Sequence, residues 1–137
     1  PRQVMNHLQD VLNSLGMPIN GTRITQLGLS FKGGVGDLRY SPALKVKELL
    51  DDRDAEIESY DPYVPQESSL TEPYTGTDVV LILTDHPEFA ELDYEQMSDK
   101  GAKLVYDAKN MIDEERVTDV GMKYANLSGD NTSFDKS

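Results

Sequence analysis

The amino-acid sequence predicts an α/β fold, with a doubly wound, mostly parallel sheet of about five strands and helices on both faces. Short apolar runs typical of strands alternate along the chain with segments of helical apolar spacing, which indicates βαβ units with right-handed crossovers. The run at 78–84, DVVLILT, is apolar almost throughout, as expected for a strand that helices cover on both faces. At 137 residues the chain fits a single domain.

The first helix and the first strand are expected near the N-terminus. Residues 2–15 place their apolar side chains on one helical face, and a glycine and a proline soon afterwards supply the end of the helix. Residues 22–29 are predicted to form the first strand and 32–37 a Gly-rich loop. Ser41 and Pro42 are then expected as the N-cap and the first residue of a second helix.

Further strands and short helical stretches are expected in the remainder of the chain. The predicted strands are 56–60, 78–84, 103–107 and 122–126, and the predicted helical stretches are 87–91, 94–100 and 112–120. Residues 65–77 are expected to be a loop or a frayed helix. The chain is therefore divided into a leading helix over 1–20, a main domain over 21–127 and a tail over 128–137. The tail is expected to be disordered because Phe134 is its only large apolar residue.

The composition argues against several classes of function. Asp and Glu number 25 against 13 Lys and Arg, a formal charge of −12, which disfavours nucleic acid as a partner. With no cysteine and two histidines, the chain offers no disulfide and no histidine or thiolate metal site. We expect no membrane association and a cytoplasmic location, because no apolar run is long enough to span a bilayer and no signal-peptide pattern is present. The acidic excess fits a halophilic surface, or simply an acidic soluble one.

The loops that follow the predicted strands contain the candidate binding residues. Ligands of open α/β sheets bind beyond the carboxyl ends of the strands, where the strand order reverses. Three cations lie in these loops, namely Lys32, Arg39 and Lys109, and in so acidic a chain they suggest an anion site. The Gly-rich loop and the helix start at Ser41 are expected to add backbone N–H donors, and the glycines to let the backbone approach a ligand closely.

These residues also have plainer structural interpretations. Arg39 could simply pair with Asp37 across a turn, and His86 is more typical of a capping or packing histidine than of a catalyst. Asp107 is expected to hold Lys109 toward the crevice. The Gly-rich loop matches neither G-x-G-x-x-G nor G-x-x-x-x-G-K-[ST], so the sequence contains no dinucleotide or Walker motif.

Five segments occur together in the order and spacing of a known family. They are LGLSFK at 27–32, DLRYSPA at 37–43, YDP at 60–62, TDHPEF at 84–89 and DAKN at 107–110. On these residues the chain resembles the C-terminal UDP-binding domain of the nucleotide-sugar 6-dehydrogenases, which include the UDP-glucose and UDP-N-acetylmannosamine dehydrogenases. The resemblance implies a Rossmann-like fold, with 21–127 as the UDP-binding domain and 1–20 as the connector from upstream domains.

The resemblance also implies a reaction and a set of site residues. The family oxidises the C6 alcohol of a UDP-hexose to a carboxylate in two NAD-dependent steps, with the substrate held between an N-terminal dinucleotide-binding domain and this one. By analogy Phe31 and Lys32 contact the UDP-sugar, Lys109 binds the uridine nucleotide, and Arg39 reaches NAD across the cleft. Family members carry arginine where Lys109 stands, so this chain lacks the planar two-pronged donor there. The pair Asp85-His86 favours the N-acetylhexosamine branch, and so UDP-N-acetylmannosamine as the sugar.

The resemblance further implies that the chain is one part of a longer enzyme. The family's catalytic cysteine, dinucleotide fingerprint and central dimerising helix belong to upstream regions, and none occurs in these 137 residues. We therefore expect the fragment alone to be inactive and to hold no catalytic residue, with NAD bound mainly by the missing domain of a homo-oligomer. The alternative is a stand-alone doubly wound regulatory or interaction module. A phosphoacceptor receiver would need adjacent acidic residues where this chain has Gly28-Leu29-Ser30.

Overall fold

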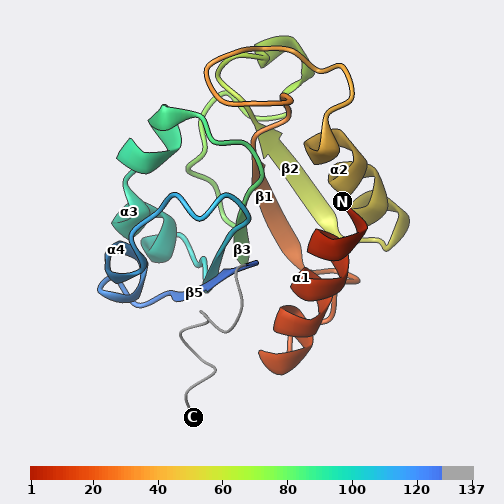
Figure 1. Ribbon diagram of the computed structural model, residues 1–137. Coiled ribbons are helices and arrows are strands. Elements are labelled where there is room, and N and C mark those ends of the chain that lie inside the picture. Colours follow the sequence, from red (N-terminus) through yellow and green to blue (C-terminus); the bar gives the residue numbers. More distant parts are fainter. Residues whose placement is uncertain (128–137) are drawn as a thin grey trace.

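The predicted alternation of strands and helices is confirmed in the computed structural model, which describes residues 1–127 (Figure 1). Every strand pairing in the sheet is parallel, in the order β2-β1-β3-β4-β5. The strands are β1 (Arg23–Leu27), β2 (Glu56–Tyr60), β3 (Val79–Ile82), β4 (Leu104–Asp107) and β5 (Lys123–Asn126). The predicted disordered tail at 128–137 lies outside the described residues.

Helices cover both faces of the sheet, as predicted (Figure 1). They are α1 (Arg2–Ser14), α2 (Pro42–Asp52), α3 (Tyr94–Asp99) and α4 (Glu114–Thr118), with short 3-10 turns η1 (Pro65–Glu67) and η2 (Pro87–Glu91). The stretch expected to be helical at 87–91 is thus a 3-10 turn. The first strand is shorter than its predicted range of 22–29, because Gly28 has a φ of 108° and turns the chain out of the extended conformation.

The alternation of side chains along the central strands divides the apolar residues between two cores. Val79 and Leu81 of β3 pack with α1 and α2 on one face. Val80 and Ile82 pack with η2, α3 and α4 on the other face. This two-sided burial explains why the sequence of β3 shows no polar alternation.

Helix α1 is packed as part of the first of these cores. Its residues Met5, Leu8 and Leu12 are fully buried, and α1 lies against α2 as well as the sheet. On the same helix, Nδ1 of His7 lies 2.7 Å from the hydroxyl oxygen of Tyr106 in β4. The apolar face predicted for residues 2–15 therefore packs into the core on the face of the sheet that α2 also covers.

The strand order reverses between β1 and β3. Connections from β1 lead to one side of the sheet and those from β3 to the other, which is the topology that places ligand sites beyond the carboxyl ends of such strands. Residues 28–41, the loop from β1 to α2, follow one of these strands, and residues 83–86 follow the other. The topology therefore places the predicted site residues at the position where doubly wound sheets bind ligands.

Candidate functional site

The loop from β1 to α2, residues 28–41, is fixed at its start by a buried carboxylate from another strand. Asp61 directly follows β2 and is 1% exposed. One of its oxygens accepts hydrogen bonds from the N–H groups of Leu29 and Ser30, at 2.8 and 3.0 Å. Its other oxygen accepts from the N–H of Tyr63 at 2.9 Å. The end of β2 thus determines the direction in which the loop leaves β1.

This environment keeps Asp61 ionised. Burial by itself opposes the charged form and would raise the pKa of the carboxyl. The hydrogen bonds from His86 and from the N–H groups of Leu29, Tyr63 and Ser30 outweigh burial and lower the pKa of Asp61 to about 2. A carboxylate with this many donors is a structural anchor for the loop and is not poised to exchange protons near neutral pH.

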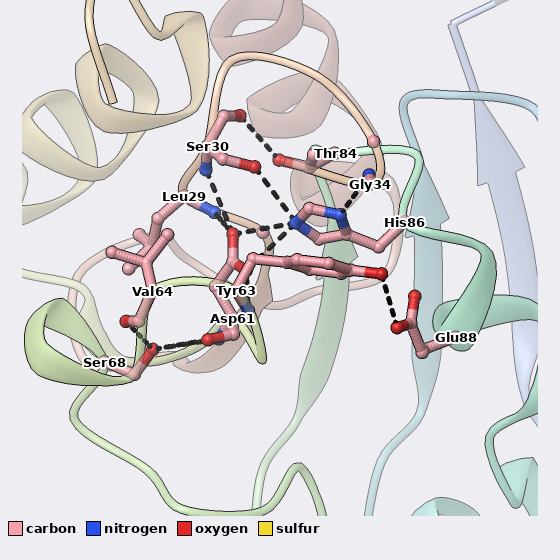
Figure 2. Close-up of polar contacts among 12 residues, drawn as sticks. Leu29, Ser30, Gly34, Asp61, Tyr63, Val64, Ser68, Thr84, His86 and Glu88 are labelled. Atoms are coloured by element: carbon pink, nitrogen blue, oxygen red, sulfur yellow. Dashed lines mark hydrogen bonds and ion pairs between the residues drawn. The ribbon is translucent and has the colours of Figure 1, made fainter. Parts of the chain in front are cut away.

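His86 connects Asp61 to the tip of the loop. The imidazole is fully buried, with Nε2 2.9 Å from Oδ1 of Asp61 and 3.0 Å from the hydroxyl of Ser30. On the other side of the ring, Nδ1 accepts a 3.0 Å hydrogen bond from the N–H of Gly34. Because Nδ1 accepts, the neutral ring carries its proton on Nε2 and donates it toward Asp61. Figure 2 shows the ring between these partners, with Tyr63 stacked on it at 4.4 Å between centroids.

Residues 84 and 85 make two further contacts with the same loop. The hydroxyl of Thr84 donates to the carbonyl of Ser30 at 3.0 Å, and a carboxylate oxygen of Asp85 accepts from the N–H of Gly33 at 2.6 Å. A Cβ on Gly33 would lie 2.3 Å from the carbonyl oxygen of Asp85. Glycine is needed at this position because two loops of the protein approach each other, and not, as the sequence suggested, because a ligand does.

The role predicted for the backbone N–H groups of the Gly-rich loop was wrong for Gly33 and Gly34. We expected these donors to face an anion, but the N–H groups of Gly33 and Gly34 are bound by Asp85 and His86. Ser41 occupies the predicted N-cap position of α2, yet its hydroxyl donates to the carbonyl of Leu29 at 2.6 Å and caps no helical N–H. The N–H groups of Gly33 and Gly34 and the hydroxyl of Ser41 thus hold the loop together, whereas the first N–H groups of α2 have no side-chain cap.

The predicted contacts Phe31 and Lys32 project from the middle of this fixed loop. Phe31 is 48% exposed, although it is a large apolar side chain, and Lys32 is exposed beside it. The N–H of Phe31 donates to the carbonyl of Asp37 at 2.7 Å, which closes the loop on itself. An exposed aromatic ring and an exposed cation thus follow each other in the chain just beyond the carboxyl end of β1.

Arg39 forms the pair that its spacing suggested. Its guanidinium donates to both carboxylate oxygens of Asp37 at 3.1 Å, and its backbone N–H donates to the same carboxylate. The hydrogen bonds from Arg39 hold the pKa of Asp37 below its usual value. The Arg39 side chain is 82% exposed, so the pair is solvated and costs little to open. The neighbouring Tyr40 is 94% exposed.

Lys109 lies in a loop whose backbone is organised by Asp107. The Asp107 carboxylate accepts from the N–H groups of Lys109, Met111 and Ile112 at 3.1, 2.8 and 2.8 Å, and from the hydroxyl of Tyr124 at 2.9 Å. Asp107 therefore holds the main chain of Lys109, and the side chain is exposed.

A cavity of about 210 Å³ adjoins Lys109. It is also lined by Pro42 and Ala43 at the start of α2 and by Val4 of α1. Lys109 therefore lies near the end of the loop that carries the other predicted site residues. A larger hollow of about 470 Å³ lies over β1 and β2, where it is lined by Arg23, Glu56 and neighbours, and contains none of the predicted site residues.

Residues 1–127 contain neither a cluster of metal-binding side chains nor a membrane-spanning helix. No three or more histidine, aspartate or glutamate side chains in that range are grouped to hold a metal ion. The helices there are all too short or too polar to cross a membrane.

Sequence reasoning favoured a capping or packing role for His86, but it assigned no role to Asp61, the centre of the network. A signal was present, because an aspartate that directly follows a strand and precedes a proline is placed to accept hydrogen bonds in the turn. The sequence could not show that its main donors come from a loop about 30 residues earlier in the chain.

Comparisons with known proteins agree with this geometry. The sequence model of the UDP-glucose/GDP-mannose dehydrogenase family, UDP binding domain, matches residues 25–114. UDP-N-acetyl-D-mannosamine dehydrogenase of Pyrococcus horikoshii is 41% identical over 93 residues, which cover 66% of this chain and 22% of the relative. UDP-glucose 6-dehydrogenase of Rhizobium meliloti is 30% identical over 129 residues, which cover 85% of this chain and 30% of the relative.

A solved structure extends the likeness to three dimensions. UDP-D-ManNAc dehydrogenase from Pyrococcus horikoshii superposes with a TM-score of 0.80 at 31% sequence identity, over 90% of this chain and 29% of that one. The chain therefore spans less than a third of the length of these relatives.

Proposed function

Because the chain belongs to the UDP-glucose/GDP-mannose dehydrogenase family as its C-terminal UDP binding domain, we propose that it binds the UDP part of a UDP-sugar at the carboxyl edge of its sheet. The observation that carries this proposal is the exposed pair Phe31 and Lys32 on a loop fixed at the reversal between β1 and β3. Family membership favours this function over the stand-alone regulatory or interaction module.

The chemistry of each predicted site residue matches one part of the proposed ligands. Lys32 and Lys109 carry the positive charge that a diphosphate requires, on a chain whose formal charge is −12. Phe31 offers a ring face to an apolar or planar part of the ligand. Lys109 binds as a flexible point charge and lacks the fixed two-pronged geometry of the family's arginine. Arg39 would exchange its exposed partner Asp37 for a phosphate of NAD.

The activity of the whole enzyme is part of the same proposal. It would oxidise the C6 alcohol of a UDP-hexose, in the N-acetylmannosamine branch, to the uronate, with NAD as the hydride acceptor. NAD would be bound mainly by an N-terminal domain that these 137 residues do not contain, in a homo-oligomeric enzyme. The cytoplasm remains the expected location, and adaptation to high salt remains an expectation from charge alone.

Thermal unfolding with and without UDP tests the binding proposal. A ligand that binds only the folded state raises the melting temperature by mass action, so UDP should raise it and uridine, which lacks the phosphates, should raise it less. Lys32→Ala should reduce the UDP effect. The matched control Lys103→Ala, which removes an exposed cation at the opposite end of the sheet, should leave it unchanged.

Two outcomes would contradict the proposal. One is a melting temperature that does not respond to millimolar UDP, in a sample that circular dichroism shows to be folded. The other is an equal loss of the UDP-induced rise in melting temperature in Lys32→Ala and Lys103→Ala. That result would mean that the rise depends on the net charge of the chain and not on a site at Lys32.

A further inference from the structure

Two consecutive residues after β3 bind two consecutive glycines of the β1–α2 loop. Asp85 accepts from the N–H of Gly33 at 2.6 Å, and His86 accepts from the N–H of Gly34 at 3.0 Å. We call these four residues the clamp. The two glycines of the clamp directly follow Lys32 in the chain, and Figure 2 shows the contact between Gly34 and the His86 ring.

The clamp holds the part of the loop whose backbone would have the largest conformational entropy if it were not held. Glycine has the largest backbone entropy of any residue, so a segment with two adjacent glycines would sample many conformations if nothing held it. Asp85 is exposed, so water can replace its hydrogen bond to Gly33, and the bond is not needed to pair a buried polar group. Its main physical effect is to restrict the loop.

The other half of the clamp is tied to the core. Nδ1 of His86 accepts the hydrogen bond from the N–H of Gly34, and Nε2 lies within hydrogen-bond distance of the buried carboxylate of Asp61. Because the ring is rigid and fully buried, it fixes the position of Gly34 relative to the end of β2. The loop is therefore held at its start by Asp61 and at its tip by the clamp, and Phe31 and Lys32 lie between these two attachments.

We propose that Asp85 and His86 are positioning residues that hold the Phe31–Lys32 segment in its ligand-binding conformation before a nucleoside diphosphate arrives. This inference rests on the proposed function, since it names the residues that prepare the same site. Pre-organisation raises affinity because the ordering entropy of the loop is lost on folding and not on binding. Neither residue is required to touch the ligand.

The exposed half of the clamp is tested with a matched pair of variants of the 137-residue chain. Asp85→Ala removes the acceptor for Gly33, whereas Asp85→Asn keeps the acceptor oxygen and removes only the charge. Calorimetric titration with UDP should show binding weakened by about tenfold in Asp85→Ala relative to Asp85→Asn, as expected when the competent loop conformation falls to a tenth of the population. Because the same contact stabilises the folded state, Asp85→Ala should also melt a few degrees below Asp85→Asn, and the titrations are made at a temperature where both variants are folded.

The buried half is tested by two replacements of His86 that each keep one contact. Asparagine can place its carbonyl oxygen near the position of Nδ1 and still accept from Gly34, while glutamine can place its amide nitrogen near Nε2 and still donate to Asp61. His86→Gln should therefore lose UDP affinity with a smaller loss of melting temperature. His86→Asn should lose more melting temperature and keep more of the affinity.

Failure of this inference differs from failure of the proposed function. If the unaltered chain binds UDP and Asp85→Ala binds it as well as Asp85→Asn, the clamp does not position the site and the inference is wrong. The opposite order of the two His86 variants would refute it equally. If the unaltered chain shows no UDP binding, the proposed function and this inference both fail.

Discussion

Replacing Asp61 with asparagine is expected to lower the free energy of unfolding by about 3–5 kcal/mol, the usual cost of breaking a buried, hydrogen-bonded charge. The carboxylate accepts from the N–H groups of Leu29, Ser30 and Tyr63 and faces Nε2 of His86. In either orientation, the amide group of asparagine directs an N–H₂ against donors that have no other buried acceptor. Each donor left unsatisfied costs about 1–3 kcal/mol.

The pH dependence of this effect follows from the lowered pKa of Asp61. The pKa falls from 3.8 to about 2 on folding, so the ionised form stabilises the native state at a pH above the unfolded value. This contribution is lost as the pH falls through the folded value near 2. Its full size is about 2 kcal/mol, and roughly 1 kcal/mol of it is lost by pH 3.

Urea denaturation of the unaltered chain and of Asp61→Asn, followed by circular dichroism at pH 5 and pH 3, measures this contribution. The other carboxylates titrate in both proteins, so the difference between the two unfolding free energies isolates Asp61. That difference should shrink by roughly 1 kcal/mol from pH 5 to pH 3. A difference that stays constant, or one that grows, would refute the assignment of Asp61 as an ionised anchor.

Four further outcomes are expected. Gly33→Ala should lower the free energy of unfolding by about 1–3 kcal/mol, measured by urea denaturation, because its Cβ would meet the Asp85 carbonyl. Leu12→Ala should lower it by about 2–5 kcal/mol, since α1 packs into the core, and a negligible change would show that α1 is dispensable. Arg39→Ala should leave the melting temperature nearly unchanged, because its pair with Asp37 is solvated, and should weaken NAD binding in the whole enzyme, as a titration with NAD would show. The chain by itself should produce no NADH from NAD and UDP-hexoses, because it has no dinucleotide fingerprint and no cysteine; measurable NADH would overturn the interpretation of the chain as an inactive fragment.

Apolar patterns in the sequence were sufficient to predict the alternation of strands and helices along the chain. The spacing of apolar residues in 2–15 predicted α1, and the continuous apolar run at 78–84 predicted a central strand buried on both faces. The helix prediction succeeds because apolar spacing follows the 3.6-residue repeat of the backbone, and the strand prediction succeeds because both faces of β3 are covered and all its side chains are apolar. The loops that carry Phe31, Lys32 and Lys109 were identified on the same basis, as the segments that follow strands.

The partners of the polar groups in those loops were decided only by the tertiary structure. Asp61 is bound to donors about 30 residues away, and Gly33 and Gly34 are held by residues 52 positions further along the chain. Such pairings depend on β2 and β3 lying on either side of β1, an order that no local pattern encodes. For this reason the sequence assigned the N–H groups of Gly33 and Gly34 to a ligand, whereas the folded chain uses them to fix the loop that presents Phe31 and Lys32.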